Sequence, residues 1–416
     1  MKSLQEFLHQ IAQTFKDKAF SVTHRTNPTY FTRASAKLTF EKLLLFLLSL
    51  PRQSAQSAIN RFLKERGYDF TLHKQSLFEA REKLSHTAFV DLNNNYFLKD
   101  FAYANEFKTF RGFRVMGVDG SVFDVPAGAH WFGTLKTCSQ AAPKAQVVAF
   151  TDVLNEYIVR ALIEPYGIGE TNVAKAMLGE FWQAGSTPSD LFLFDRGFFS
   201  RELAREIDPN AKFIFRVNSQ SLKEINEANA PDQMVIRSDK NQPKLCLRVI
   251  NYTLPNGEIE KLVTNIFDPS FSVEDFGKLY QMRWGIETCF KTLKSRLQIE
   301  DFSSAKRELI LQDFFASLFV YNVMTAAVNE ATQNAAKAEH KYVYKPNKNI
   351  AIAEIRNLLI ESTLQDDPLQ REKSFLYAMD IIMRNVVPVR PNRPSPERKV
   401  KYKSAKFPLN GKSGLP

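Results

Sequence analysis

The spacing of hydrophobic residues divides the chain into a helical region, a mixed region and a second helical region. Up to about residue 108, apolar residues recur with the helical period of about 3.6 residues, in segments at 37–50, 53–67 and 74–84. Pro51 follows the first segment and Gly67 ends the second, as is common for helix ends. The pattern predicts an all-helical N-terminal region.

The second region mixes strand and helix patterns. Three apolar runs predict strands, the last two joined as a hairpin by a short Asn-Glu turn, at 111–119, 146–155 and 157–165. Helix, strand, helix and strand patterns follow at 170–183, 191–195, 199–207 and 211–218. This order predicts an α/β fold with a mixed sheet and a hairpin edge, the order used by ribonuclease-H-like nuclease folds.

A β-rich insertion interrupts this region at 218–270. Its two strand patterns, 244–253 and 258–267, flank Asn256-Gly257, which is a strong hairpin signal. Helical patterns return at 309–330 and 350–363. We therefore predict four parts: a helical N-terminal domain at 1–108, a ribonuclease-H-like domain at 109–305, a helical C-terminal region at 306–388 and a basic tail at 389–416.

The charge of the chain favours a polyanionic partner. The formal net charge is +11, and from Arg390 onward eight lysines and arginines oppose one acid, Glu397. The predicted N-terminal helices are also basic, through Arg61, Lys64, Arg66, Lys74, Arg81 and Lys83. They fit either a helix-turn-helix-like DNA-binding module or a helical packing domain.

Composition indicates a soluble globular protein. Three scattered cysteines are too few for a disulfide framework, which favours a reducing compartment, and we expect a cytoplasmic, nucleoid-associated protein. The apolar run ending at Pro51 is too short to span a bilayer, and polar residues interrupt 309–328. No membrane role is indicated.

Three carboxylates stand out against this framework. Asp119 and Asp195 each end an apolar strand pattern, although turn chemistry alone also explains an aspartate there. Glu287 lies in a predicted helix at 280–294, whose polar face gathers a set of residues within roughly 80° of arc. The set is Tyr280, Arg283, Glu287, Lys291 and Lys294.

Carboxylates without histidine or cysteine partners are hard oxygen ligands, suited to Mg²⁺ or Mn²⁺ rather than zinc. Paired ions of this kind catalyse in-line displacement at phosphodiesters. Asp152 and Glu170 remain alternative members of the carboxylate set. Asp152 ends an apolar run, and Glu170 begins a helix, where a carboxylate also interacts favourably with the helix dipole.

The spacing Tyr280-x2-Arg283-x3-Glu287-x6-Lys294 resembles the signature of the DDE transposases of the insertion-sequence-four family, relatives of the Tn-five transposase. Asp119 in VDGS and Asp195 in FDRG match that family's first and second aspartate motifs, and the β insertion is in the expected place. The similarity covers most of residues 31 to 330.

The resemblance implies DNA transposition. Asp119, Asp195 and Glu287 would be catalytic and bind two Mg²⁺ ions, which Mn²⁺ could replace. Water would free a 3′-OH at the transposon end, and this hydroxyl would attack target DNA. Double-stranded transposon ends and target DNA would be the partners of a homodimeric synaptic complex. The residues implied or considered for DNA contact are Tyr280, Arg283, Trp284, Lys291 and Lys294, with Arg196 and Arg216 as candidates that salt bridges could equally explain.

One departure concerns a tryptophan. In the best-known relatives, a tryptophan in the β insertion accommodates a flipped base during DNA hairpin formation. This insertion has none, so Tyr252 or Phe267 is the aromatic candidate and the hairpin step stays open. A non-catalytic DNA-binding protein derived from a transposase and a stand-alone Mg²⁺ nuclease are the alternatives, and the presence of all three acids favours an active enzyme.

Overall fold

The chain folds into two compact units, and the computed structural model describes residues 2–33, 35–51, 53–132, 143–183, 189–218, 221–335 and 344–389. Unit 1 comprises Met1–Glu106, Asp124–Pro143 and Thr292–Pro416, and unit 2 comprises Phe107–Phe123 and Lys144–Lys291. Cys138, the basic tail from Arg390 onward and most of the lysine-rich linker around 337–348 lie outside the described residues. The division into four domains stays a prediction.

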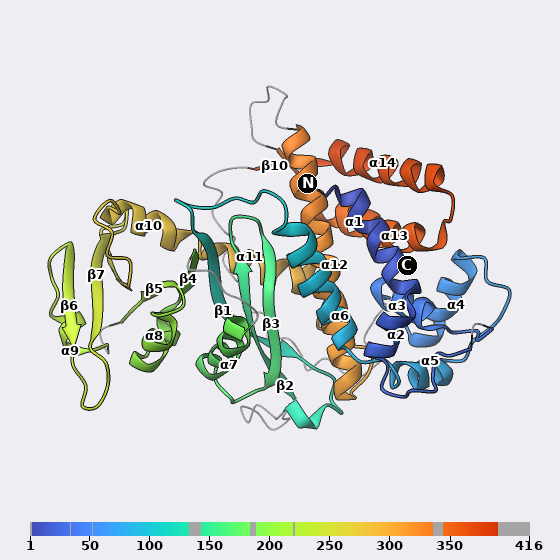
Figure 1. Ribbon diagram of the computed structural model, residues 1–416, viewed down its shortest axis with the longest axis horizontal. Coiled ribbons are helices and arrows are strands. Elements are labelled where there is room, and N and C mark those ends of the chain that lie inside the picture. Colours follow the sequence, from blue (N-terminus) through green and yellow to red (C-terminus); the bar gives the residue numbers. More distant parts are fainter. Residues whose placement is uncertain are drawn as a thin grey trace. The chain divides into compact units, whose positions relative to one another are not determined.

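An eight-stranded mixed sheet forms the centre of unit 2, in the order β3-β2-β1-β4-β5-β8-β7-β6 (Figure 1). The strands are β1 (Arg114–Asp124), β2 (Lys144–Asp152), β3 (Tyr157–Pro165), β4 (Asp190–Phe194), β5 (Lys212–Arg216), β6 (Asp232–Arg237), β7 (Leu245–Thr253) and β8 (Ile259–Thr264). Strands β1, β4 and β5 are parallel, and β2 and β3 form the antiparallel hairpin. The predicted α/β fold with a ribonuclease-H-like mixed sheet is confirmed.

The predicted β insertion extends this sheet. Strands β7 and β8 form the hairpin expected around Asn256-Gly257, where Gly257 has a φ of 85° that favours glycine. Strand β8 then pairs antiparallel with β5. Strand β6 adds an edge that the sequence did not indicate, because most of its side chains are exposed and it lacks a clear apolar alternation.

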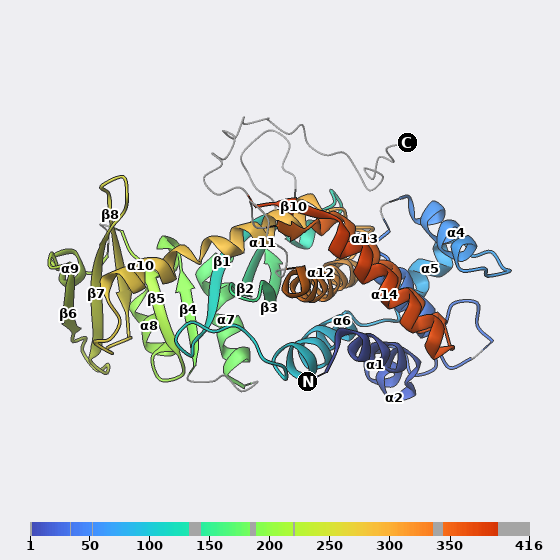
Figure 2. The ribbon, with the colours of Figure 1, turned by 90° about the horizontal axis from the view of Figure 1, so that it is seen from above.

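Helices cover both faces of the sheet. Figure 2 shows α7 (Glu170–Gln183) and α8 (Arg201–Ile207) on one face, and α10 (Val273–Gln281) and α11 (Trp284–Ser295) on the other. Strand β4 serves both faces: Leu191 and Leu193 share a core cluster with Leu279 of α10, whereas the Phe192 ring lies 5.7 Å from that of Phe181 in α7. Two short segments, η3 (Arg196–Phe198) and α9 (Lys223–Asn226), complete the unit.

Unit 1 is helical and packs around one long helix, α12 (Arg307–Ala335). By length and composition, the segment Arg307–Gln333 could cross a membrane, but 89% of its most apolar window is buried inside the structure, as in a core helix. The other elements are α1 (Leu4–Lys16), α2 (Lys18–His24), α3 (Phe40–Leu48), α4 (Ala55–Glu65), α5 (Lys74–Arg81), α6 (Thr87–Asp91), the π-helical η1 (Leu92–Ala102), η2 (His130–Phe132), β9 (Tyr344–Pro346), α13 (Lys348–Leu364), α14 (Pro368–Arg384) and β10 (Val386–Pro388).

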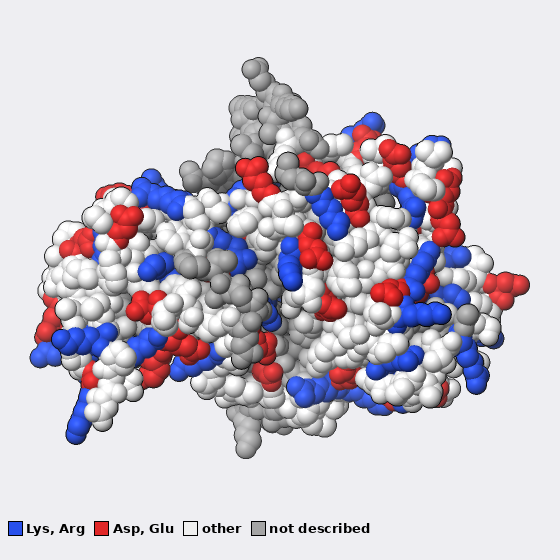
Figure 3. Space-filling model, viewed as in Figure 1, with Lys and Arg blue, Asp and Glu red and all other residues white. Residues whose placement is uncertain are grey.

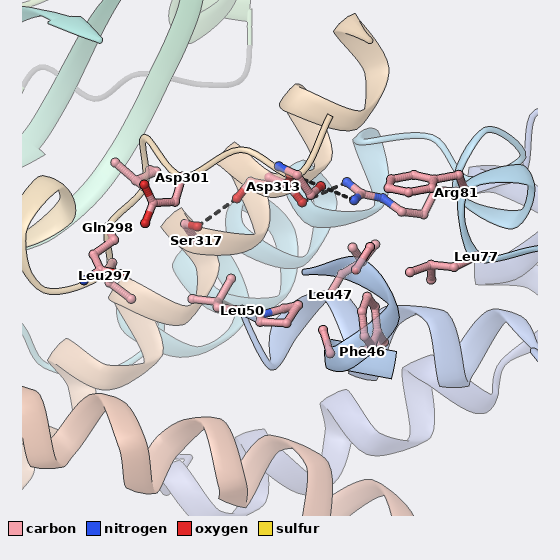
Figure 4. Close-up of a pocket in the computed structure, with 16 residues that line it drawn as sticks. Phe46, Leu47, Leu50, Leu77, Arg81, Leu297, Gln298, Asp301, Asp313 and Ser317 are labelled. Carbon is pink, nitrogen blue, oxygen red and sulfur yellow. Dashed lines mark hydrogen bonds and ion pairs between the residues drawn. The ribbon is translucent and has the colours of Figure 1, made fainter. Parts of the chain in front are cut away.

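One basic residue of the N-terminal helices is part of this core. The Arg81 side chain is only 2% exposed, and its Nη2 lies 2.8 Å from Oδ1 of Asp313 in α12. Its Nε donates a hydrogen bond to Gln312, and Figure 4 shows the guanidinium turned toward Asp313. Arg81 therefore holds α5 against α12, as the helical packing alternative for these helices would have it.

Candidate active site

Strand pairing brings Asp119 and Asp195 to the same level of the sheet. Strands β1 and β4 pair in parallel from Arg114 with Asp190 to Val118 with Phe194, so the two aspartates follow the last paired residues. At the other end of the pair, the Arg114 guanidinium donates to both carboxylate oxygens of Asp190, at 2.7 and 3.0 Å. Asp195 follows the end of β4 as predicted, whereas β1 continues to Asp124, so Asp119 lies within its strand.

Both aspartates lie on the face that α10 and α11 cover. Side chains alternate along a strand, so Asp119 shares its face with Gly117, and Asp195 shares its face with Leu193. A methyl group built on Gly117 would lie 3.5 Å from Cβ of Ile286, which shows how closely α11 approaches β1. The absence of a side chain at Gly117 therefore lets α11 approach this face closely.

The predicted single helix at 280–294 is two helices separated by a tight turn. Helix α10 ends at Gln281 and α11 begins at Trp284, and the Arg283 N–H donates to the Tyr280 carbonyl at 3.0 Å. Tyr280 and Arg283 are each only 2% exposed, so these two members of the predicted polar face are buried.

The Arg283 guanidinium lies among all three predicted acids. Its Nη1 is 3.6 Å from Oδ2 of Asp119, and its Nη2 is 3.8 Å from Oδ2 of Asp195. The same Nη2 donates to Oε1 of Glu287 at 3.1 Å. Within the described part of the chain, Nε and Nη1 of Arg283 have no hydrogen-bond acceptor. One buried cation is thus shared by three carboxylates.

Asp195 is held as a carboxylate by its surroundings. Burial raises its pKa, but the Arg196 N–H bond, Arg283 and Arg216, and the Tyr280 hydroxyl outweigh that effect, so the net shift is downward. The Arg196 N–H and the Tyr280 hydroxyl donate to Oδ1 at 2.7 and 3.2 Å. Burial also raises the pKa of Tyr280, which keeps the phenol protonated as a donor.

Asp119 shows the opposite shift. Burial is the main cause that raises its pKa from 3.8 to about 6, and the negative charges of Glu170 and Asp195 add to it. The Gly120 N–H, which donates to Oδ1 at 2.9 Å, and the Arg283 charge offset only part of this rise. Two neighbouring aspartates therefore have their pKa values moved in opposite directions.

The remaining candidates differ in their partners and in their exposure. Arg216 Nε is 3.2 Å from Oδ1 of Asp195 while its Nη1 pairs with Glu260 at 2.8 Å. Lys294 Nζ lies 3.6 Å from Glu300. The side chains of Arg196 and Lys291 are exposed, and Trp284 is 56% exposed beside Arg283.

These carboxylates lie in a region that comparison with known families identifies. The profile of the family described as "Transposase DDE domain" matches residues 112–323, slightly more than half of the chain. The chain belongs to this family. The protein is thus a DDE transposase, of the class of enzymes that cleave DNA and transfer DNA strands.

The chain resembles the cryo-EM structure of a piggyBac transposase synaptic complex with hairpin DNA, at 10% identity and a TM-score of 0.45, over 96% of this chain and 87% of that one. Among curated protein sequences there is no significant match.

The donor chemistry of the site fits the divalent metal ions that DDE domains use. Asp119, Asp195 and Glu287 offer only carboxylate oxygens, which suit Mg²⁺ and Mn²⁺, and they already gather around one cation, Arg283. In the described residues, no group of three or more histidine, cysteine or acidic side chains is close enough to hold an ion as they stand. The acids of the transposase therefore fit a metal ion by the chemistry of their donor atoms.

Two residues left open by the sequence make contacts elsewhere in the structure. They are Asp152, considered for the carboxylate set, and Tyr252, considered as the aromatic partner of a flipped base. Asp152 is fully buried, and its oxygens accept from the backbone N–H and the side-chain amide of Asn155, so it stabilises the β2–β3 turn. The Tyr252 ring packs closely against Gly277 of α10: a Cβ added to Gly277 would lie 2.3 Å from the ring. The position of this ring is therefore fixed by its contact with α10. Phe267, by contrast, is 44% exposed.

Sequence reasoning missed two contributors to the site. Glu260 pairs with Arg216, and Gly120 provides both the N–H bonded to Asp119 and an open space beside it. Glu260 comes from the insertion, and no local signal relates it to residues far earlier in the chain. The glycine of Asp119-Gly120 was visible but is equally typical of a turn.

Proposed function

We propose that this transposase belongs to the insertion-sequence-four group, with Tyr280, Arg283, Glu287 and Lys294 as its signature, and that it acts on the terminal inverted repeats of its own element. It would cleave DNA at the element's ends and join the freed 3′ ends to target DNA. The observation that carries the proposal is the convergence of Asp119, Asp195 and Glu287 on the single buried cation of Arg283.

Asp119, Asp195 and Glu287 would hold two Mg²⁺ ions, or Mn²⁺ in their place. Bound ions of this kind activate the attacking oxygen and stabilise the leaving oxygen in displacement at phosphorus. The protein orients the acids: the Arg196 N–H and the Tyr280 hydroxyl fix Asp195, and the Gly120 N–H fixes Asp119. Arg283 would offset part of their negative charge before metal and DNA arrive.

DNA would contact the exposed side chains next to the acids, which are Arg196, Trp284 and Lys291. Arg216 and Lys294 can contribute only if they exchange Glu260 and Glu300 for phosphate. On the face shown in Figure 3, basic and acidic side chains are interspersed. We therefore expect the acids and their neighbours, rather than one broad basic patch on that face, to position DNA for cleavage. Pairing two ends would require at least a homodimer, and the protein would act in the cytoplasm on the nucleoid.

The test is cleavage of a duplex that carries the element's own terminal repeat, with Mg²⁺ and a supercoiled target. The intact protein is compared with Glu287→Gln and with Glu180→Gln, a control on the exposed side of α7. We expect cleaved ends that join the target, with both activities lost in Glu287→Gln while DNA binding persists, and retained in Glu180→Gln.

Other outcomes would favour the alternatives. If the intact protein binds DNA but does not cut it with Mg²⁺ or Mn²⁺, it is a DNA-binding scaffold. Cutting without joining would indicate a stand-alone nuclease.

A further inference from the structure

A fourth carboxylate, Glu170, lies beside the two aspartates. It is the first residue of α7, on the crossover between the strands that carry Asp119 and Asp195. The next residue, Thr171, donates a hydrogen bond to the carbonyl of Gly197 at 3.3 Å, which ties the start of α7 to the loop after Asp195. The fold thus fixes Glu170 close to the second aspartate motif.

Gly120 gives this carboxylate its place next to Asp119. A methyl group on Gly120 would lie 2.3 Å from Cδ and 2.4 Å from Oε1 of Glu170, distances that real Cβ atoms do not show. The carboxylate therefore occupies the space that any larger residue at position 120 would fill. Gly120 is also the donor to Asp119, so the two acids lie on either side of one peptide unit.

Gln146 holds Glu170 in this position. Its amide is on β2, the residue is only 5% exposed, and it donates to Oε1 of Glu170 at 3.1 Å. A carboxylate that served only the helix dipole would need neither the buried amide nor the space above Gly120. Glu170 is thus oriented by three separate parts of unit 2: β1, β2 and the loop after β4.

Several like charges lie close together at this place. Asp119, Asp195 and Glu287 share Arg283, whose Nε and Nη1 have no hydrogen-bond acceptor in the described chain, and Glu170 adds a fourth carboxylate close to Asp119. Arg216 is divided between Asp195 and Glu260. Like charges this close disfavour ionisation unless a cation joins them. An added divalent cation would relieve this repulsion.

We propose that Glu170 is a fourth carboxylate of the active site and helps to hold a divalent cation at Asp119. The inference rests on the proposed function, because it assumes that the three predicted acids bind metal. Carboxylate oxygen is the right ligand for such an ion. Gly120 would then be required as the residue that leaves room for this ligand.

The test measures Mn²⁺ binding to the full-length protein without DNA, by calorimetry and by the loss of the free-ion electron paramagnetic resonance signal. Glu170→Gln removes the charge, and Gly120→Ala keeps the glutamate but displaces its flexible end. Glu180→Gln is the matched control on the same helix. We expect both Glu170→Gln and Gly120→Ala to weaken Mn²⁺ binding by about tenfold or more, as is typical when a group that supports a metal site is lost, and Glu180→Gln to leave it unchanged.

A parallel measurement with Asp119→Asn tests the role of Glu170 separately from the metal site of the proposed function. If Asp119→Asn weakens Mn²⁺ binding but Glu170→Gln and Gly120→Ala do not, the role of Glu170 is overturned and the proposed function stands. If Asp119→Asn has no effect either, the metal site itself, and with it the proposed function, is wrong. A loss of thermal stability in Glu170→Gln with unchanged Mn²⁺ affinity would reduce Glu170 to a helix-terminal residue and overturn the inference.

Discussion

Asp119, a proposed metal ligand, is expected to destabilise the metal-free fold near neutral pH because of its raised pKa. Its pKa is about 6 in the folded protein against a usual 3.8, so the folded state holds its proton more tightly than the unfolded state. Below about pH 4 both states are protonated and the shift has no effect on stability. As the pH rises toward 6 the unfolded state loses its proton first, so stability falls, by at most about 3 kcal/mol.

We therefore expect Asp119→Asn to raise the free energy of unfolding of the metal-free protein by about 1–3 kcal/mol near neutral pH. The gain should shrink toward zero near pH 4. Denaturant unfolding with a chelator present, repeated across this pH range, measures it.

Asp195→Asn is the matched comparison, because the pKa of Asp195 is shifted in the opposite direction. Because the pKa of Asp195 is lower in the folded state, its charged carboxylate stabilises the fold at pH values above the unfolded-state pKa. This stabilisation is lost as the pH falls through the folded-state pKa of Asp195. This variant should therefore be less stable than the intact protein at neutral pH. If the two variants moved together, the described electrostatics of the pair would be wrong.

At the scale of elements, the contact between the β7–β8 hairpin and α10 depends on one glycine. Gly277 faces the Tyr252 ring, and an added Cβ would lie 2.3 Å from it. We expect Gly277→Ala to destabilise the protein by about 1–3 kcal/mol in denaturant unfolding, because the ring has to move.

Gly179 on α7 provides the control, since nothing lies within 4 Å of a Cβ built there. Gly179→Ala should be neutral or stabilise by about 0.4–1 kcal/mol. In a Tyr252→Ala background the loss caused by Gly277→Ala should disappear, and a persistent loss would place its cause elsewhere.

A second contact between secondary-structure elements is the ion pair that joins β1 to β4. Asp190 is fully buried and accepts two hydrogen bonds from Arg114. Asp190→Asn should lower the free energy of unfolding by about 3–5 kcal/mol, because it removes the carboxylate that accepts two hydrogen bonds from the largely buried Arg114 guanidinium. Glu65→Gln, in the exposed Arg61–Glu65 pair, should change it by less than about 1 kcal/mol under the same conditions. Equal effects would contradict the burial of the Arg114 pair.

The sequence predicted elements well where a strong local signal exists. The hairpin around Asn256-Gly257 and the helix at 170–183 are both confirmed. It was wrong about the helix at 280–294, because helical spacing does not reveal the turn at Met282 and Arg283, next to which Tyr280 and Arg283 are buried. Which residues carry the site could be proposed from their types and spacing, but contacts such as Glu260 with Arg216 depend on tertiary structure.

At the scale of the whole molecule, net charge governs binding to DNA. Of the formal +11, the tail from Arg390 onward contributes eight basic residues and one acid. We expect DNA affinity to fall steeply with salt, and truncation after Val389 to weaken binding and reduce the slope of log K against log salt by as much as about 6. Fluorescence anisotropy with a labelled duplex between 50 and 200 mM salt, a range over which such slopes are readily resolved, measures this.

The truncated protein also serves as its own control for folding. Its circular dichroism and unfolding midpoint should match those of the full chain. If the salt slope stayed unchanged, the tail would be a solvated segment that does not neutralise phosphates.

The parallel pairing of β1 with β4 also bears on how this sequence can change over evolutionary time. The two aspartates are level because residues 114–118 pair one to one with residues 190–194. An insertion of one residue within either strand would turn the aspartate that follows it to the other face of the sheet. The long crossover between these strands has no such constraint in its surface loops. Length variation among descendants of this chain should therefore collect in the crossover loops, while the distance from Arg114 to Asp119 and from Asp190 to Asp195 stays fixed.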